Sequence, residues 1–159
     1  KGLSVGEASK ATIIHSMFER SNIGVAVKDL SSVRVHSGSF YMNDTAVSAY
    51  QKKPAFGGAH GAITGALFWK NGSNFLVDEK SRIKLAGAGI EKWQKHPRIS
   101  ETELRVGEIE SEYQYIAGDG IRFVGKDGSI FYRGPRTKEE LSAGEVMPDL
   151  SHVPVGMGQ

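Results

Sequence analysis

The sequence contains no cysteine. This absence excludes a disulfide framework, thiolate metal sites and a cysteine nucleophile, so any nucleophile must be an oxygen or a lysine. No run approaches about 18 apolar residues, and the sequence therefore predicts no membrane span. None of the five histidines has the spacing His-x-x-x-His, and we predict neither a zinc site nor any other metal.

Neither sign of charge dominates, because 20 Lys and Arg residues oppose 18 Asp and Glu residues. The basic residues are spread along the chain rather than gathered in one arm, so a nucleic-acid partner is not indicated. With 159 residues and 39% hydrophobic content, the chain has the size of one domain with a core of its own. We expect a single domain over residues 1–150 and a C-terminal tail over residues 151–159.

The residue pattern in the first half of the chain predicts a helix, then short strands, a short helix and a hairpin. Ser4 and Glu7 form a capping box, and the apolar residues that follow recur at helical spacing, which predicts an amphipathic helix over residues 4–20. Short β-type runs follow at residues 23–27, 33–36 and 39–42, and Asp44 is then expected to cap a short helix over residues 46–50. The Asn-Gly pair in residues 70–74 predicts a β-hairpin.

The second half predicts consecutive strands at residues 104–106, 109–116, 121–124 and 130–133, and then a short helix capped by Thr137. We find no internal repeat of fixed period. The expected fold is α+β, with a twisted and mainly antiparallel sheet, the N-terminal amphipathic helix and one or two short helices packed against it.

Three glutamates alternate along the predicted strand at residues 108–115. A period of two places Glu108, Glu110 and Glu112 on one face, where crowding raises the pKa of a carboxylate. Such a group can act as a general base or stabilise developing positive charge. The alternative interpretation is the solvent-facing side of an antiparallel strand.

Residues 130–148 read as a strand ending in Tyr132 and Arg133, a basic turn, a short acidic helix, a glycine and then Met147 and Pro148. This segment resembles the opening segment of arginine-specific ADP-ribosyltransferase toxins. In those toxins the arginine strand comes first and the glutamate pair last, and the present chain has the opposite order.

The resemblance implies a site that uses NAD as its substrate. Arg133 would hold the NAD phosphates, Ser39 would correspond to the strand serine that orders the site, and Glu110 and Glu112 would form the Glu-x-Glu pair. Glu112 would stabilise the oxocarbenium-like ribose as nicotinamide leaves, and Glu101 with Glu103 is a rival pair.

A second pattern of the same chemistry begins with a histidine. It runs from His36 or His15 through Tyr41 and Tyr50 to Glu112, so His36 is a candidate catalytic residue and the two tyrosines are candidates for binding NAD.

The leading hypothesis is a small exported effector or toxin-type catalytic domain that cleaves NAD and transfers ADP-ribose to a protein target. The first residue is Lys1, which agrees with a processed or excised domain that is secreted or translocated into a target cell, although a cysteine-free chain also suits the cytoplasm. One alternative is a non-catalytic module, either a pilin-like structural subunit or a domain that binds a partner protein or inhibitor. A third is a metal-independent nuclease toxin that uses His36 or His60 with Arg133.

If Glu112 is catalytic, Glu112→Gln abolishes NAD turnover and leaves thermal stability nearly unchanged, because the substitution removes charge but little volume. Nicotinamide release and a melting curve measure the two effects, with Glu108→Gln as the neighbouring control. Unchanged turnover, or a parent chain that does not turn over NAD, would contradict the hypothesis.

Overall fold

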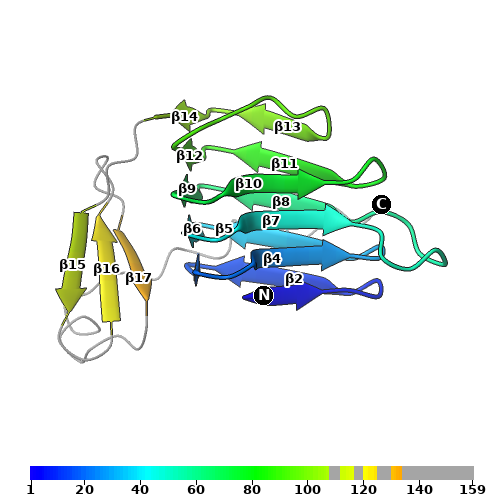
Figure 1. Cartoon of the computed structure of the whole chain (residues 1–159), viewed down its shortest axis with the longest axis horizontal. Coiled ribbons are helices and arrows are strands. Elements are labelled where there is room, and N and C mark those ends of the chain that lie inside the picture. Colours follow the sequence, from blue (N-terminus) through cyan, green and yellow to red (C-terminus); the bar gives the residue numbers. More distant parts are fainter. Residues whose placement is uncertain (108–111, 117–119, 125–129, 134–159) are drawn as a thin grey trace, which may run out of the picture.

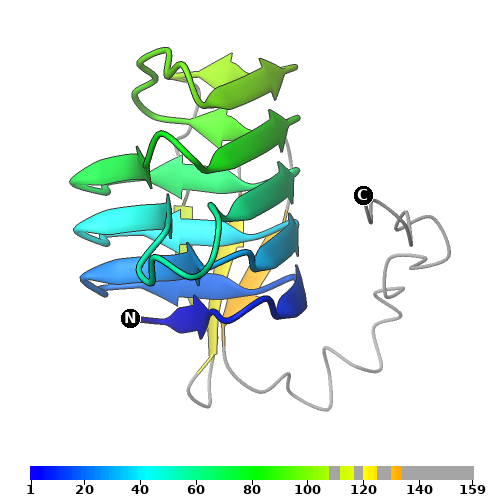
Figure 2. The same cartoon turned by 90° about the vertical axis from the view of Figure 1, so that its right-hand side faces the viewer.

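The structure, a computed structural model, describes residues 1–107, 112–116, 120–124 and 130–133. Residues 1–107 wind through stacked coils, and each full coil crosses three sheets in turn (Figures 1 and 2). Sheet A contains β1 (Leu3–Val5), β4 (Ile23–Lys28), β7 (Thr45–Tyr50) and β10 (Ser73–Val77). Sheet B contains β2 (Lys10–Ile14), β5 (Ser32–His36), β8 (His60–Thr64), β11 (Arg82–Ala86) and β13 (Ile99–Thr102). Sheet C contains β3 (Met17–Glu19), β6 (Ser39–Tyr41), β9 (Leu67–Trp69), β12 (Gly89–Ile90) and β14 (Arg105–Val106).

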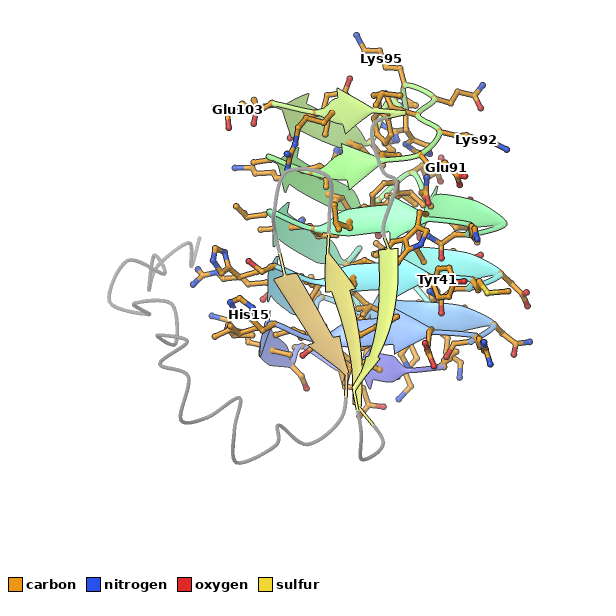
Figure 3. The ribbon with its side chains drawn as sticks, turned by 90° about the vertical axis from the view of Figure 1, so that its left-hand side faces the viewer. His15, Tyr41, Glu91, Lys92, Lys95 and Glu103 are labelled. Atoms are coloured by element: carbon orange, nitrogen blue, oxygen red, sulfur yellow. The ribbon has the colours of Figure 1, made fainter. Side chains whose placement is uncertain are left out.

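Every strand pair in these three sheets is parallel, and this architecture is a parallel β-helix. Among the described strands, antiparallel pairing is confined to β15 (Glu112–Ile116), β16 (Gly120–Val124) and β17 (Ile130–Arg133). This small sheet stands beside sheet C (Figures 1 and 3).

Equivalent residues in successive coils are 22 positions apart in the sequence at several points of the solenoid. The Ser9 N–H donates to the Ser31 hydroxyl, and the Ala59 N–H donates to the Ser81 hydroxyl, each across 22 residues. The strand pairs Val25–Val47 and Ile63–Leu85 have the same separation.

Two coils depart from this spacing of 22 residues. Asn43 and Asn71 occupy equivalent corners but are 28 residues apart, because the third coil carries extra residues between β7 and β8. The last coil is shorter than the others, since it pairs Ile83 with Ile99 and has no strand in sheet A.

One residue in the left-handed conformation turns each coil from sheet B into sheet C. These residues have φ between 47° and 62° and stand at the same place in successive coils: His15, Ser37, Gly65, Gly87 and Glu103. A non-glycine residue pays about 1–2 kcal/mol for this conformation. The next coil offsets part of that cost, since the N–H groups of His15 and Ser37 donate to the carbonyls of His36 and Thr64 at 3.0 and 2.9 Å.

The core is built from columns of like side chains stacked along the axis. Phe18, Phe40 and Phe68 form one column, with ring centroids separated by 5.3 and 4.6 Å. Phe40 and Phe68 are fully buried, whereas Phe18 in the first coil is half-buried. Burial of a phenylalanine contributes roughly 1.5–3 kcal/mol before packing is counted.

Asparagines join the coils at the corner between sheets C and A. The Asn71 Oδ1 accepts hydrogen bonds from the backbone N–H and the side-chain amide of Asn43, at 3.0 and 3.1 Å. The Asn43 amide also donates to the carbonyl of Phe18 at 2.9 Å, and the Asn71 amide donates to the carbonyl of Phe40 at 3.0 Å. The corner therefore satisfies backbone groups that have no strand partner.

The predicted N-terminal helix is wrong, and residues 4–20 form β1, β2, β3 and the corners between them. Glu7, Ala8 and His15 have φ of 60°, 58° and 47°, which are incompatible with a right-handed helix. Short strands separated by corners produced an apolar spacing close to that of a helix. Each of these strands is stabilised by its partner in the next coil, which local periodicity does not reveal.

The other local errors have the same origin. Residues 46–50 belong to β7 rather than to a helix, and Asn71 lies at a corner between two sheets rather than in a hairpin. The α+β class with a mainly antiparallel sheet is thus replaced by three parallel sheets, and the coils form an internal repeat that the sequence did not reveal. The described residues contain no helix, and hence none able to cross a membrane. The helix expected after Thr137 and the tail at residues 151–159 lie outside the described residues.

We predict that Phe68→Ala lowers the free energy of unfolding by about 3–5 kcal/mol, because the side chain is fully buried and stacked between two coils. Phe18→Ala should cost less, since its ring is half-buried. Leu76→Ala is the control, because this side chain is 62% exposed and its loss should change stability by at most about 0.5 kcal/mol. Urea denaturation measures all three, and equal losses for the two phenylalanines would contradict the stacked core.

Candidate binding surface on sheet B

The outer side of sheet B is a flat surface of three columns. Alternation along each strand sends every second residue outward, and parallel register aligns these residues from coil to coil. The first column is Lys10, Ser32, His60 and Arg82; the second is Thr12, Arg34, Ala62, Lys84 and Ser100; the third is Ile14, His36, Thr64, Ala86 and Thr102. All are exposed or half-buried, and we call this surface the sheet B face.

The sheet B face carries cationic side chains and no acidic one at its outward positions. Adjacent coils lie about 4.8 Å apart, so like charges stacked directly above one another would repel. The columns avoid this arrangement: Arg34 and Lys84 are separated by Ala62, and Lys10 and Arg82 by a serine and a histidine. Positive charge is thereby distributed over both columns along the axis.

The acidic residues in the first 107 positions lie elsewhere. They occupy the corner between sheets A and B, the region where sheet C turns into sheet A, and the last coil: Glu7, Asp29, Asp78, Glu79, Glu19, Asp44, Glu91, Glu101 and Glu103. Residues 1–107 hold 15 Lys and Arg against nine Asp and Glu, whereas residues 108–159 hold five against nine. Residues 1–107 are therefore basic, although the net charge of the whole chain is close to zero.

Asp29 holds the loop that borders the sheet B face. This loop, residues 51–59, contains the extra residues of the third coil and projects at the corner between sheets A and B (Figures 1 and 2). The Asp29 Oδ1 accepts hydrogen bonds from the backbone N–H groups of Lys52 and Lys53, both at 2.7 Å. The Lys53 side chain pairs with Glu7, and this hydrogen-bonded ion pair raises the pKa of Lys53 and lowers that of Glu7.

The Asp29 side chain is buried, with 1% of the residue exposed. Two opposing effects act on its pKa. Burial raises it, but the hydrogen bonds from Lys53 and Lys52 and the charges of Lys28 and Lys53 together outweigh burial. The pKa is therefore lowered from its ordinary value of 3.8, and the ionised carboxylate stabilises the loop.

The structure places the predicted site residues on different sides of the solenoid. His36 lies on the sheet B face, with its ring 6.4 Å from that of His15. Tyr50 ends β7 in sheet A, and its hydroxyl accepts a hydrogen bond from Lys1 at 3.3 Å. Ser39 and Tyr41 share the outer side of β6 in sheet C, so these two share a surface that neither His36 nor Tyr50 shares.

Ser39 and Tyr41 are both buried although they alternate with the core residue Phe40. Ser39 is fully buried, and its hydroxyl has no hydrogen-bond partner among the described residues. Tyr41 stacks on Trp69 with centroids 4.9 Å apart, and the Lys70 Nζ lies 5.8 Å from the Tyr41 ring. Tyr41 lies in sheet C, the sheet beside which β15–β17 stand (Figure 3).

The glutamate and arginine candidates belong to the three-stranded sheet. Glu110 lies outside the described residues, Glu112 begins β15, and Arg133 ends β17. Strand β16 separates them: Glu112 is paired with Val124, whereas Arg133 is paired with Ile121. The strands that carry the two candidates are therefore not neighbours. Use of NAD by these residues stays a prediction.

Sequence reasoning missed the sheet B face because its residues are far apart in the chain. Lys10, Arg34 and Lys84 are members of three different coils, and the sequence showed them only as scattered basic residues. Aligning the chain coil by coil would have grouped them. Among residues 1–107, no three His, Asp or Glu side chains gather in a way that could hold a metal ion.

Comparison with protein-family models, with curated proteins and with solved structures gives no match to this chain.

We predict that Asp29→Asn weakens the dependence of thermal stability on acid pH. A lowered folded-state pKa gives a stabilisation that is fully present above the ordinary value of 3.8 and is lost as the pH falls through the lower, folded value. The asparagine can still accept the N–H groups but does not titrate. Melting curves from pH 2 to pH 6 compare the two proteins, and parallel curves would contradict the assignment.

Proposed function

We propose that this chain is a non-catalytic binding module whose sheet B face binds an extended acidic polysaccharide. The observation that carries this proposal is the composition of the sheet B face, where Lys10, Arg34, Arg82 and Lys84 occupy outward positions of aligned strands and no acidic residue occupies such a position. A flat array of cations along a straight axis suits a ligand that repeats negative charge along its length.

The polar side chains between the cations favour a polysaccharide. Serine and threonine hydroxyls alternate with the charges and can both donate and accept hydrogen bonds, as sugar hydroxyl groups do. They are Thr12, Ser32, Thr64, Ser100 and Thr102. An acidic polysaccharide supplies an anion and hydroxyls from the same chain, which matches this mixture.

Nucleic acid is matched less well by the same surface. The outward positions of sheet B hold no Phe, Tyr or Trp, so successive bases have no aromatic platform on which to stack. A flat face of parallel strands also lacks the helix or two-stranded ribbon that enters a major groove.

The test is binding to heparin as a sulfated polysaccharide, with dextran as the uncharged polymer and duplex DNA as the rival polyanion. Arg34→Glu with Lys84→Glu should weaken heparin binding by at least about tenfold and reduce the slope of affinity against salt by about two. Arg20→Glu with Lys70→Glu makes the same change of charge at the opposite corner and should have a much smaller effect. Isothermal titration at several salt concentrations measures both.

If the two double variants lost heparin affinity equally, the sheet B face would not be the binding surface. Tighter binding of duplex DNA than of heparin would contradict the polysaccharide.

A further inference from the structure

At the end of the solenoid, sheet A has one strand fewer than sheets B and C. Sheets B and C continue into the fifth coil with β13 and β14, whereas sheet A ends at β10. The chain passes from β12 to β13 through residues 91–98 and forms no strand on the way. One side of β10 therefore pairs with β7, and its other side is the edge of the sheet.

Residues 91–98 cover the core without completing sheet A. Trp93 packs edge-on against Phe75, with centroids 5.8 Å apart and planes at 86°. The Asn74 side-chain amide donates to the carbonyl of Lys92 at 3.0 Å and fixes this segment above β10. A cleft of about 470 Å³ lies between β10 and residues 92–96, and we call it the notch.

The edge of β10 presents backbone groups beside the notch. Just after the strand, Asp78 donates its N–H toward β7, to the carbonyl of Ala49 at 3.0 Å. The register of β10 with β7 is continuous from Phe75 to Val77, and the backbone groups of successive residues point to opposite sides of a strand. Those of Phe75 and Val77 therefore point to the open edge. An extended chain laid along this edge would form the strand that sheet A lacks in the fifth coil.

The side chains around the notch define the chemistry of such a chain. Lys92, Lys95 and His96 line it, and Lys92 and Lys95 project from this end of the solenoid (Figure 3). The nearby acidic side chain of Glu91 is engaged by the backbone N–H of Lys70 at 2.8 Å. Phe75 and Trp93 provide apolar surface in the same cleft. The combination suits alternating acidic and apolar residues.

We propose that the notch binds an extended acidic peptide segment of a partner protein, which adds to β10 as the fifth strand of sheet A. Main-chain hydrogen bonds to Phe75 and Val77 hold the peptide, and Lys92 and Lys95 select its acidic side chains. This site is separate from the sheet B face and does not depend on the proposed polysaccharide.

The probe is an acetylated and amidated hexapeptide of alternating Glu and Val, and its control has Lys in place of Glu. Trp93 fluorescence reports binding, because the other tryptophan, Trp69, is only 3% exposed. The acidic peptide should bind at least about tenfold more tightly than the basic one, and Lys92→Glu with Lys95→Glu should remove this preference. Arg34→Glu with Lys84→Glu should leave it intact, which separates the notch from the sheet B face.

Strand addition is tested through the backbone of the peptide. One derivative of the acidic hexapeptide carries N-methyl groups on every Glu, and a matched derivative carries them on every Val. Because alternate N–H groups of an added strand point to opposite sides, only one derivative loses its hydrogen bonds to β10. We expect that derivative to bind at least about tenfold more weakly than the other. Hydrogen exchange in the unmodified protein should also slow at the amides of Phe75 and Val77 when the parent peptide is added.

Four results would overturn the proposal. They are absence of peptide binding at millimolar concentration, equal affinities of the two N-methylated derivatives, binding without added protection at Phe75 and Val77, and quenching of Trp93 by heparin or by an oligonucleotide but not by the peptide.

Discussion

The structure depends on the parallel, in-register stacking of one coil on the next. Because each strand hydrogen-bonds to the strand one coil away, every residue stands between its own equivalents in the adjacent coils. Side chains that gain from contact with their own kind therefore form columns. Phe18, Phe40 and Phe68 gain stacking in this way, and Asn43 and Asn71 exchange hydrogen bonds. The left-handed corner at His15 and Ser37 also repeats, since a coil that turned elsewhere would lose register with the next.

The same constraint decides where the chain can vary. Extra residues enter at the corner before β8 without changing the register of the strands on either side, because Asp29 and the preceding coil hold the loop 51–59 from outside the sheets. Loss of residues in the fifth coil is different, since the shortened chain crosses the core at Trp93 and leaves sheet A incomplete. Insertion produces a loop, whereas deletion exposes a strand edge.

Sequence reasoning succeeded where structure is local and failed where it is not. Runs of β-forming residues bounded by turns predicted strands at residues 23–27, 33–36 and 39–42, and these runs coincide within one residue with β4, β5 and β6. The strands predicted at residues 121–124 and 130–133 likewise coincide with β16 and β17. Residues 4–20 were misread because their partners lie in the next coil, and the unequal lengths of the third and last coils hid the repeat. The sheet B face was missed for the same reason, since Arg34 and Lys84 are placed in one column only by the stacking of their coils on Ala62.

Lys92 and Lys95 at the notch oppose pairing of two copies through the open edge of β10 and favour an acidic partner at the same edge. An open strand edge is a template for any extended chain, and a second copy of the same edge is the nearest candidate in a concentrated solution. Two copies joined through β10 would bring Lys92 and Lys95 of each copy close together, and the repulsion would oppose such a dimer. An acidic peptide meets the same lysines as an attraction. The side chains that keep this edge from pairing with itself are thus the ones that admit a partner of opposite charge, and a single arrangement provides both solubility and selectivity.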